Sequence, residues 1–219
     1  LILLKFSFSF LHHLANNAEN SIGICGKVIL QPAHSGAFAE KTSRKDWRKK
    51  EGDDTARCDL SVERIVVQPH AKELMVVSLW KKSLKGRHLT EIKEDDSMVD
   101  LFASKMTDVI RRVQGSHLDN GTWAICATPK RRHLTKNFAC RIAAKIGENL
   151  HLHYYEDVAI SDSRERVNKV YTLGVLPDEP NLIIFDDFVT TGSTLLSMKR
   201  LLEPLGKNLV FFVGINNNM

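Results

Sequence analysis

Three short apolar segments, separated by two stretches of helical periodicity, constrain the fold of this chain more than any other feature. The apolar segments are Trp123–Ala127, Leu182–Phe185 and Leu209–Val213. Consecutive apolar residues are typical of strands that are buried on both faces. Residues 138–150 carry an apolar stripe with a spacing of four, and residues 193–205 also have a helical pattern. This alternation predicts an α/β fold in which helices flank an open parallel sheet.

The region upstream of these segments predicts further elements of the same domain. Two β-rich runs, Ile65–Val67 and Leu74–Trp80, flank Pro69-His70-Ala71-Lys72 and indicate a hairpin with its turn at those four residues. The pattern Ser97-x-x-Asp100 resembles a capping box, and apolar residues then recur at helical spacing up to Gly115. We therefore expect a long helix after the hairpin, and a further short strand within residues 150–155.

Composition excludes several classes of protein but identifies none. The chain has 219 residues, of which 43% are hydrophobic and 26% are charged, so a disordered or collagen-like chain is excluded. A net charge of +5 is compatible with nucleic acid or with a phosphorylated small molecule as a ligand. No two of the four cysteines have the CxxC spacing of a zinc or redox site, and we expect reduced thiols.

The chain divides into an N-terminal extension, residues 1–60, whose pattern is hard to interpret, and a domain spanning residues 61–219. Within the extension, the charged run Glu40–Asp54 is typical of a solvated surface. Its basic part, residues 44–50 with Trp47, leaves nucleic-acid binding open as an alternative. The apolar start, Leu1–Leu14, is too short and too interrupted by polar residues to span a bilayer, so we expect a cytoplasmic protein without a membrane partner.

The segment Asn181–Leu196, NLIIFDDFVTTGSTLL, carries the chemistry. The predicted strand delivers Asp186 and Asp187 at its carboxyl end, where ligands bind in open parallel sheets. The turn Thr190–Thr194 then opens a helix and offers backbone N–H groups and hydroxyls to an anion. Gly192 lets the backbone come close to a phosphate. Because carboxylates accept hydrogen bonds from vicinal hydroxyls, the predicted ligand is a ribose with a 5′-phosphate.

Two simpler interpretations of this segment account for less of it. In the first, the turn is only a helix N-cap made by Ser193 or Thr190, but one cap does not require two acids, three threonines, a serine and a glycine. The second is a known nucleotide-binding turn. The segment lacks the Gly-Lys-Ser/Thr of a P-loop and the GxGxxG pattern of a dinucleotide-binding turn.

Four apolar residues, two acids, two variable residues and TTGST resemble the phosphoribosyl-pyrophosphate (PRPP) motif of type I phosphoribosyltransferases. Upstream residues are similar to the competence-protein-F-like (ComF-like) subgroup of that family. They are the Pro-containing basic segment Thr128–Arg132, the helix entry Lys136-Asn137-Phe138 and the Arg-rich segment Ser163–Asn168. The resemblance covers residues 61–219. It departs from the subgroup in one respect, since many members begin with a cysteine-rich zinc module that this sequence lacks.

The resemblance implies a type I phosphoribosyltransferase fold with a small hood or N-terminal appendage. It implies Mg²⁺-dependent transfer of phosphoribose from PRPP to an unidentified base or amine, with release of pyrophosphate. Asp186 and Asp187 would hold the ribose and, directly or indirectly, the metal, and Arg164 and Lys169 would act with them from a mobile hood. The other residues implied in PRPP binding are Thr128, Pro129, Lys130, Arg131, Phe188, Val189, Thr190, Thr191, Gly192, Ser193 and Thr194.

Two other functions stay open at the level of the sequence, because a fold does not fix an activity. One is a module that senses PRPP or a nucleotide without turning it over. The other is an accessory protein in DNA uptake that uses residues 44–50 on DNA. The sequence is also compatible with a homodimer.

Overall fold

The structure of the chain is a computed structural model, which describes residues 56–70, 73–129, 137–161 and 171–217. These residues belong to one compact unit, residues 55–219. The strands are β1 (Arg57–Cys58), β2 (Val66–His70), β3 (Leu74–Ser83), β4 (Arg87–His88), β5 (Trp123–Ala127), β6 (His153–Tyr155), β7 (Ala159–Ser161), β8 (Tyr171–Leu173), β9 (Asn181–Val189) and β10 (Asn208–Asn216). The helices are α2 (Leu89–Glu94), α3 (Ser97–Gln114), α4 (Phe138–Leu150) and α5 (Ser193–Leu202), with 3-10 turns η1 (Gly115–Asn120) and η2 (Glu203–Leu205).

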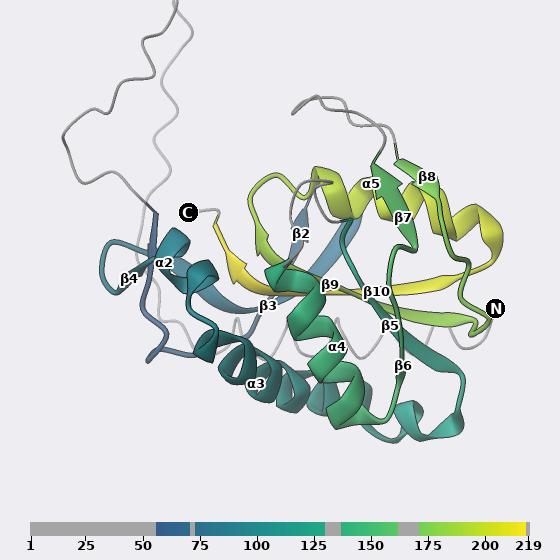
Figure 1. The fold of residues 1–219 in the computed structure, drawn as a ribbon, viewed down its shortest axis with the longest axis horizontal. Helices are drawn as coiled ribbons and strands as arrows, with labels where there is room; N and C mark the ends of the chain where they lie inside the picture. Colours follow the sequence, from purple (N-terminus) through teal and green to yellow (C-terminus); the bar gives the residue numbers. More distant parts are fainter. Residues whose placement is uncertain (1–55, 71–72, 130–136, 162–170, 218–219) are drawn as a thin grey trace, which may run out of the picture. The chain divides into compact units, whose positions relative to one another are not determined.

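Five parallel strands form the centre of the sheet, in the order β3-β10-β9-β5-β6. At one side β1 and β2 pair antiparallel with β3, and β4 pairs with β1. A separate antiparallel ribbon is made of β7 and β8. In Figure 1, α3 and α4 lie on one face of the central sheet and α5 lies on the other. The predicted open sheet of mostly parallel strands flanked by helices is therefore confirmed.

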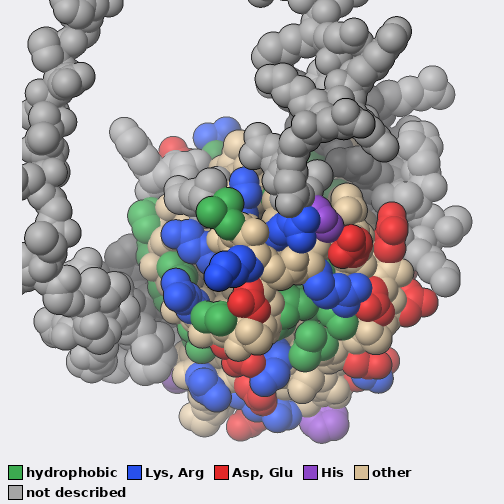
Figure 2. All heavy atoms as spheres, turned by 90° about the vertical axis from the view of Figure 1, so that its left-hand side faces the viewer, with side chains coloured by type: hydrophobic (Ala, Val, Ile, Leu, Met, Phe, Trp, Pro, Cys, Tyr) green, Lys and Arg blue, Asp and Glu red, His purple; other side chains and the backbone are tan. Residues whose placement is uncertain are grey.

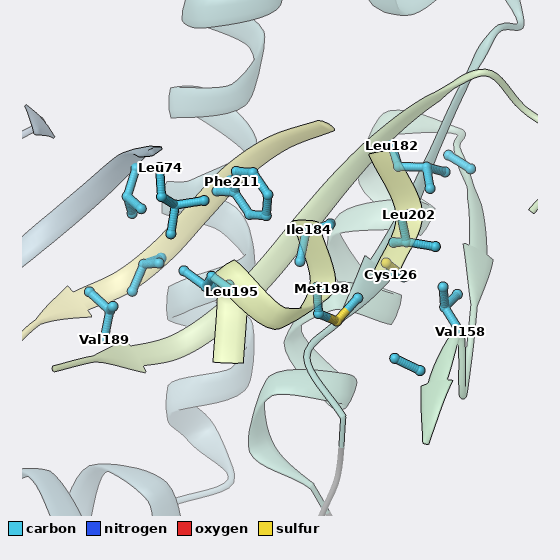
Figure 3. Close-up of a cluster of buried hydrophobic side chains, with 14 residues drawn as sticks. Leu74, Cys126, Val158, Leu182, Ile184, Val189, Leu195, Met198, Leu202 and Phe211 are labelled. Atoms are coloured by element: carbon cyan, nitrogen blue, oxygen red, sulfur yellow. The ribbon is translucent and has the colours of Figure 1, made fainter. Parts of the chain in front are cut away.

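The two faces of the sheet are covered by separate apolar cores. On one face the Trp80 ring of β3 lies 4.5 Å from the Phe102 ring of α3, and Phe102 lies 5.4 Å from the Phe138 ring of α4. On the other face, α5 packs its apolar side against residues of several strands (Figure 3). The buried α5 residues in that cluster are Leu195, Met198 and Leu202. Burial on both faces explains the continuous apolar runs in the sequence.

Three local predictions differ from the structure. Pro69 and His70 belong to β2 and pair with β3, so the hairpin turn lies after them. The capping box at Ser97 is absent, because the N-cap is Asp96, whose side chain makes no capping bond; Asp95 instead accepts from the N–H and hydroxyl of Ser97. The third difference is the length of β9: the predicted strand ends at Phe185, whereas β9 continues through both acids to Val189.

Candidate active site at the ends of β5 and β9

The acid pair lies on a part of β9 that is paired on one side only. Pairing with β5 ends at Phe185, opposite Ala127, whereas pairing with β10 continues beyond Asp186, opposite Val213. The sequence suggested that the strand ends at Phe185, because the two acids interrupt its apolar pattern. The backbone bonds to β10 instead carry the strand four residues further and hold the acids on a regular element.

Asp186 is held by the end of the neighbouring strand. The N–H of Thr128 donates to the carbonyl of Phe185 at 2.9 Å, and the Thr128 hydroxyl donates to Oδ1 of Asp186 at 2.8 Å. The same Oδ1 accepts the N–H of Asp187 at 3.0 Å. Burial, and secondly the charge of Asp187, raise the pKa of Asp186 to about 8, although the Thr128 hydroxyl acts in the opposite direction. The carboxyl group therefore holds a proton more readily than an ordinary aspartate.

Asp187 is held by a residue that the sequence analysis did not single out. Its Oδ1 accepts the N–H of Phe188 at 2.8 Å, and its Oδ2 lies 2.6 Å from Nζ of Lys93 on α2. The Lys93 ammonium also lies 4.4 Å from the centre of the Phe188 ring, a cation–π geometry. Lys93 stands in a charged segment, EIKEDD, whose pattern predicts only a solvated surface.

The turn between β9 and α5 is exposed at its hydroxyl-bearing residues. Thr190, Thr191 and Ser193 are exposed, and Gly192 has φ of +73°, a left-handed conformation that favours glycine. The α5 helix begins at Ser193; its N-cap, Gly192, has no side chain to cap it, and the Thr191 hydroxyl accepts the N–H of Ser193 in a long bond of 3.4 Å. The first N–H groups of a helix lack partners inside the helix, so they are directed at this turn. The Thr191 hydroxyl donates to Oγ of Ser193 at 3.1 Å, so an anion at the turn would find exposed hydroxyls and backbone N–H groups but would replace this local bond to use the Thr191 donor.

The end of β10 supports this turn. The N–H of Asn217 donates to the carbonyl of Val189 at 2.7 Å, and its side-chain amide donates to the Thr190 hydroxyl at 3.1 Å. Asn217 is a second residue that the sequence analysis missed, because it lies in a polar run, Asn216-Asn217-Asn218, without a recognisable spacing. It fixes the first residue of the turn to the strand next to β9.

The order of strands reverses between β5 and β9. From β5, the chain passes through α4 to β6 on one side, whereas from β9 it passes through α5 to β10 on the other side. The two helices lie on opposite faces of the sheet (Figure 1). In open α/β sheets, ligands bind at the carboxyl ends of the strands at such a reversal. Thr128, Asp186 and Asp187 stand at this position.

Some predicted site residues fall outside the described part of the chain. Pro129 is described and half-buried, next to Thr128. Lys130 and Arg131, and the predicted hood residues Arg164 and Lys169, lie outside the described residues. Their roles therefore stay predictions. The same applies to the basic segment 44–50, for which nucleic-acid binding was an alternative.

Figure 2 shows the face that carries α2 and β4, where basic and acidic side chains lie side by side.

The acid pair fits the coordination chemistry of Mg²⁺. Carboxylate oxygens are hard ligands, and Mg²⁺ commonly uses only one or two of them together with water and substrate phosphates. Within residues 56–217, as far as the structure describes them, no cluster of three or more His, Cys, Asp or Glu side chains is arranged as a metal site. In the same residues no helix is both long and apolar enough to cross a bilayer.

Comparisons with known proteins give matches among solved structures only; no family model and no curated protein matches the sequence. The chain resembles an adenine phosphoribosyltransferase from Thermoanaerobacter pseudethanolicus, with 14% identity, a TM-score of 0.39, and coverage of 68% of this chain and 81% of that chain. An orotate phosphoribosyltransferase from Aeropyrum pernix gives 15% identity, a TM-score of 0.40 and coverage of 62% and 68%. An adenine phosphoribosyltransferase from Trypanosoma brucei, solved with AMP, pyrophosphate and ribose-5-phosphate, gives 9% identity and a TM-score of 0.42, and the match covers 75% of this chain and 77% of that chain.

Proposed function

We propose that this chain is a Mg²⁺-dependent phosphoribosyltransferase of the ComF-like group, which transfers phosphoribose from PRPP to a base or amine. The observation that carries the proposal is the meeting of Thr128 and Asp186 where the strand order reverses, since ligands bind there in open sheets. The turn Thr190–Thr194, in which Thr190, Thr191 and Ser193 are exposed, follows the same strand. Acceptors for sugar hydroxyls are therefore followed along the chain by donors for a phosphate.

In this proposal, Asp186 and Asp187 bind the two ribose hydroxyls. The raised pKa of Asp186 and the ammonium of Lys93 beside Asp187 reduce the negative charge of the pair. This matters because PRPP is itself a polyanion, and two unpaired carboxylates would repel its phosphates. The acid pair is therefore suited to a ribose that carries phosphates on both sides.

The turn binds the 5′-phosphate. Its exposed hydroxyls, Thr191 and Ser193, and the first N–H groups of α5 donate to the phosphate oxygens, and the positive end of the helix dipole favours the anion. Gly192 provides the left-handed conformation with which the chain enters the helix. These donors fix one end of the substrate relative to the anomeric carbon.

The reaction is a displacement at the anomeric carbon. The lone pair of the acceptor nitrogen forms a bond to C1 as the C1–O bond breaks, and pyrophosphate leaves with the bonding electrons. The acceptor then loses a proton. Positioning of the ribose and stabilisation of the developing negative charge supply the rate, and no covalent enzyme intermediate is needed.

Bound Mg²⁺ would neutralise charge on the diphosphate and be held by Asp186 and Asp187, directly or through water. Lys130 and Arg131 would donate to the pyrophosphate, and Arg164 and Lys169 would close over PRPP and exclude water. These four assignments depend on the resemblance of the sequence.

Calorimetric titration with PRPP and Mg²⁺, followed by a pyrophosphate-release assay with a panel of bases and amines, tests the proposal. The variant D186N/D187N should lose at least tenfold in PRPP affinity and still fold. The control is D108N/D119N, which removes two exposed carboxylates elsewhere. Equal PRPP affinity in both double variants would contradict the assigned site. PRPP binding without pyrophosphate release from any acceptor would identify a sensor.

A further inference from the structure

Lys93 occupies the position that a cation bound to Asp187 would take. Its Nζ lies 2.6 Å from Oδ2 of Asp187 and 4.4 Å from the centre of the Phe188 ring. The Asp187 side chain is only 12% exposed, whereas that of Lys93 is 43% exposed. The carboxylate is thus largely removed from water, and its neutralising partner is an ammonium that still reaches solvent.

The position of Lys93 is fixed by α2. Ile92, the preceding residue, is fully buried, so the helix is anchored to the core directly beside Lys93. Arg87, just before the helix, pairs with Asp95, just after it, at 2.8 Å. The backbone of Lys93 is therefore held on both sides. Its long side chain can still rotate, so the ammonium can move away from Asp187.

We propose that Lys93 is the resident counter-ion of Asp187 and competes with a divalent cation for that carboxylate. The ammonium and a hard dication both need the same carboxylate oxygens, so each excludes the other from Oδ2 of Asp187. The divalent cation gains the acid pair as the ammonium leaves the carboxylate, and a second anion that attracts the ammonium, such as a substrate phosphate, favours this exchange. Lys93 is therefore a positioning residue that orders the arrival of cation and anion.

Removing the ammonium has a defined consequence. In Lys93→Met the apolar part of the side chain remains, but a mostly buried carboxylate loses its counter-charge. A divalent cation then binds without first displacing an ammonium from the carboxylate. Because the Lys93 side chain is 43% exposed, solvent weakens the pair, and we expect a gain in cation affinity of about fivefold.

A titration with Mn²⁺ in the absence of PRPP tests this proposal. Electron paramagnetic resonance measures the concentration of free Mn²⁺. We expect K93M to bind Mn²⁺ about fivefold more tightly than the unaltered protein, and K93R to bind it as weakly as the unaltered protein. In K93M/D187N the gain should disappear. The matched control is K145M, since Lys145 is 46% exposed and pairs with Glu148 at 3.1 Å on α4.

Unchanged or weaker Mn²⁺ binding by K93M, or an equal gain in K145M, would overturn the proposal. The unaltered protein gives a second measurement: the ¹⁵N signal of the Lys93 ammonium should shift on titration with Mg²⁺, and a constant signal would also overturn it. The inference takes only the location of the site from the proposed function. If the protein did not bind PRPP, the proposed function would be contradicted but the Mn²⁺ result would still hold. If K93M did not gain Mn²⁺ affinity, the inference would be contradicted but the proposed function would not.

Discussion

The hydroxyl of Thr128 donates to the carboxylate of Asp186 across 2.8 Å, so the end of β5 is joined to an acid on β9. The two residues are 58 positions apart in the chain. Thr128 is 6% exposed, so water does not readily replace the bond. This contact places a donor and an acid of the candidate site on adjacent strands, and it can be removed without changing the shape of the side chain.

Thr128→Val should weaken PRPP binding about fivefold to tenfold, because a typical intramolecular hydrogen bond contributes about 1–1.5 kcal/mol. The pKa of Asp186 should rise further, since the Thr128 hydroxyl lowers it. Calorimetry with PRPP measures the first effect. Thr107→Val is the control, because Thr107 is also buried, at 4% exposure, and bonds to Ala103 within α3. An equal loss of affinity in both variants would contradict a direct role for Thr128.

The contribution of Asp186 to the stability of the protein without ligand should fall as pH rises from about 4 to about 8. Burial raises the pKa of Asp186 from 3.8 to about 8, so in this interval the folded state holds a proton that the unfolded state has lost. Asp186→Asn removes this titration. The free energy of unfolding of this variant, minus that of the unaltered protein, should therefore be larger at pH 8 than at pH 5, so the substitution is more stabilising at pH 8.

Urea unfolding at the two pH values measures that difference. Asp108→Asn, which replaces an exposed carboxylate on α3, serves as the control and should not show the same increase. If Asp186→Asn were equally stabilising at pH 5 and pH 8, the assignment of a raised pKa to Asp186 would be wrong.

Gly192→Ala should destabilise the protein by about 1–2 kcal/mol, because φ of +73° places its side chain in the left-handed region. It should also weaken PRPP binding. Gly206→Ala separates the two effects, since Gly206 has φ of +77° and open space where an added methyl group would lie. We expect a similar fall in melting temperature for both variants and weaker PRPP binding only for Gly192→Ala. Similar losses of affinity would argue against a phosphate at the turn.

Gly214→Ala should displace the acid pair. A methyl group at Gly214 of β10 would lie 2.7 Å from Cε1 of Phe102 and 2.8 Å from the carbonyl oxygen of Asp187, so the strand or the helix must shift. Overpacking of this kind costs roughly 1–3 kcal/mol. Gly147→Ala, also crowded at 3.1 Å from the carbonyl of Leu152, is the control away from the acids. PRPP affinity should fall only in Gly214→Ala, as measured by calorimetry.

Two elements with clear apolar patterns were predicted from the sequence almost residue by residue, whereas α5 ends earlier and β3 and β10 extend further than their patterns predict. The strand Trp123–Ala127 and the helix that starts at Phe138 agree with β5 and α4, because buried faces leave an apolar pattern that local sequence displays. The strands β1, β4, β7 and β8 have two or three residues each and were not predicted. Such segments are too short for a periodicity to appear.

The candidate site was predictable where its residues are consecutive and not where they meet through the fold. The pattern from Asp186 to Thr194 is visible in the sequence, and Thr128 follows from the resemblance. Lys93 and Asn217 reach the acids and the turn by way of α2 and β10. Their positions depend on strand order and on helix packing, which short-range spacing does not encode. The predicted end of β9 at Phe185 was wrong for the same reason, since β10 prolongs it.

At the end of the sheet opposite the acids, the ammonium of Lys207 contacts the carbonyl oxygens of Pro177, Asp178 and Glu179 at 2.6, 3.4 and 3.1 Å. It thereby ties the start of β10 to the segment that leads into β9. The strand that carries the acids, β9, is consequently held at both ends, by Lys207 near its first residue and by Asn217 near its last residue. The position of the two carboxylates along the strand direction is therefore fixed before a ligand binds.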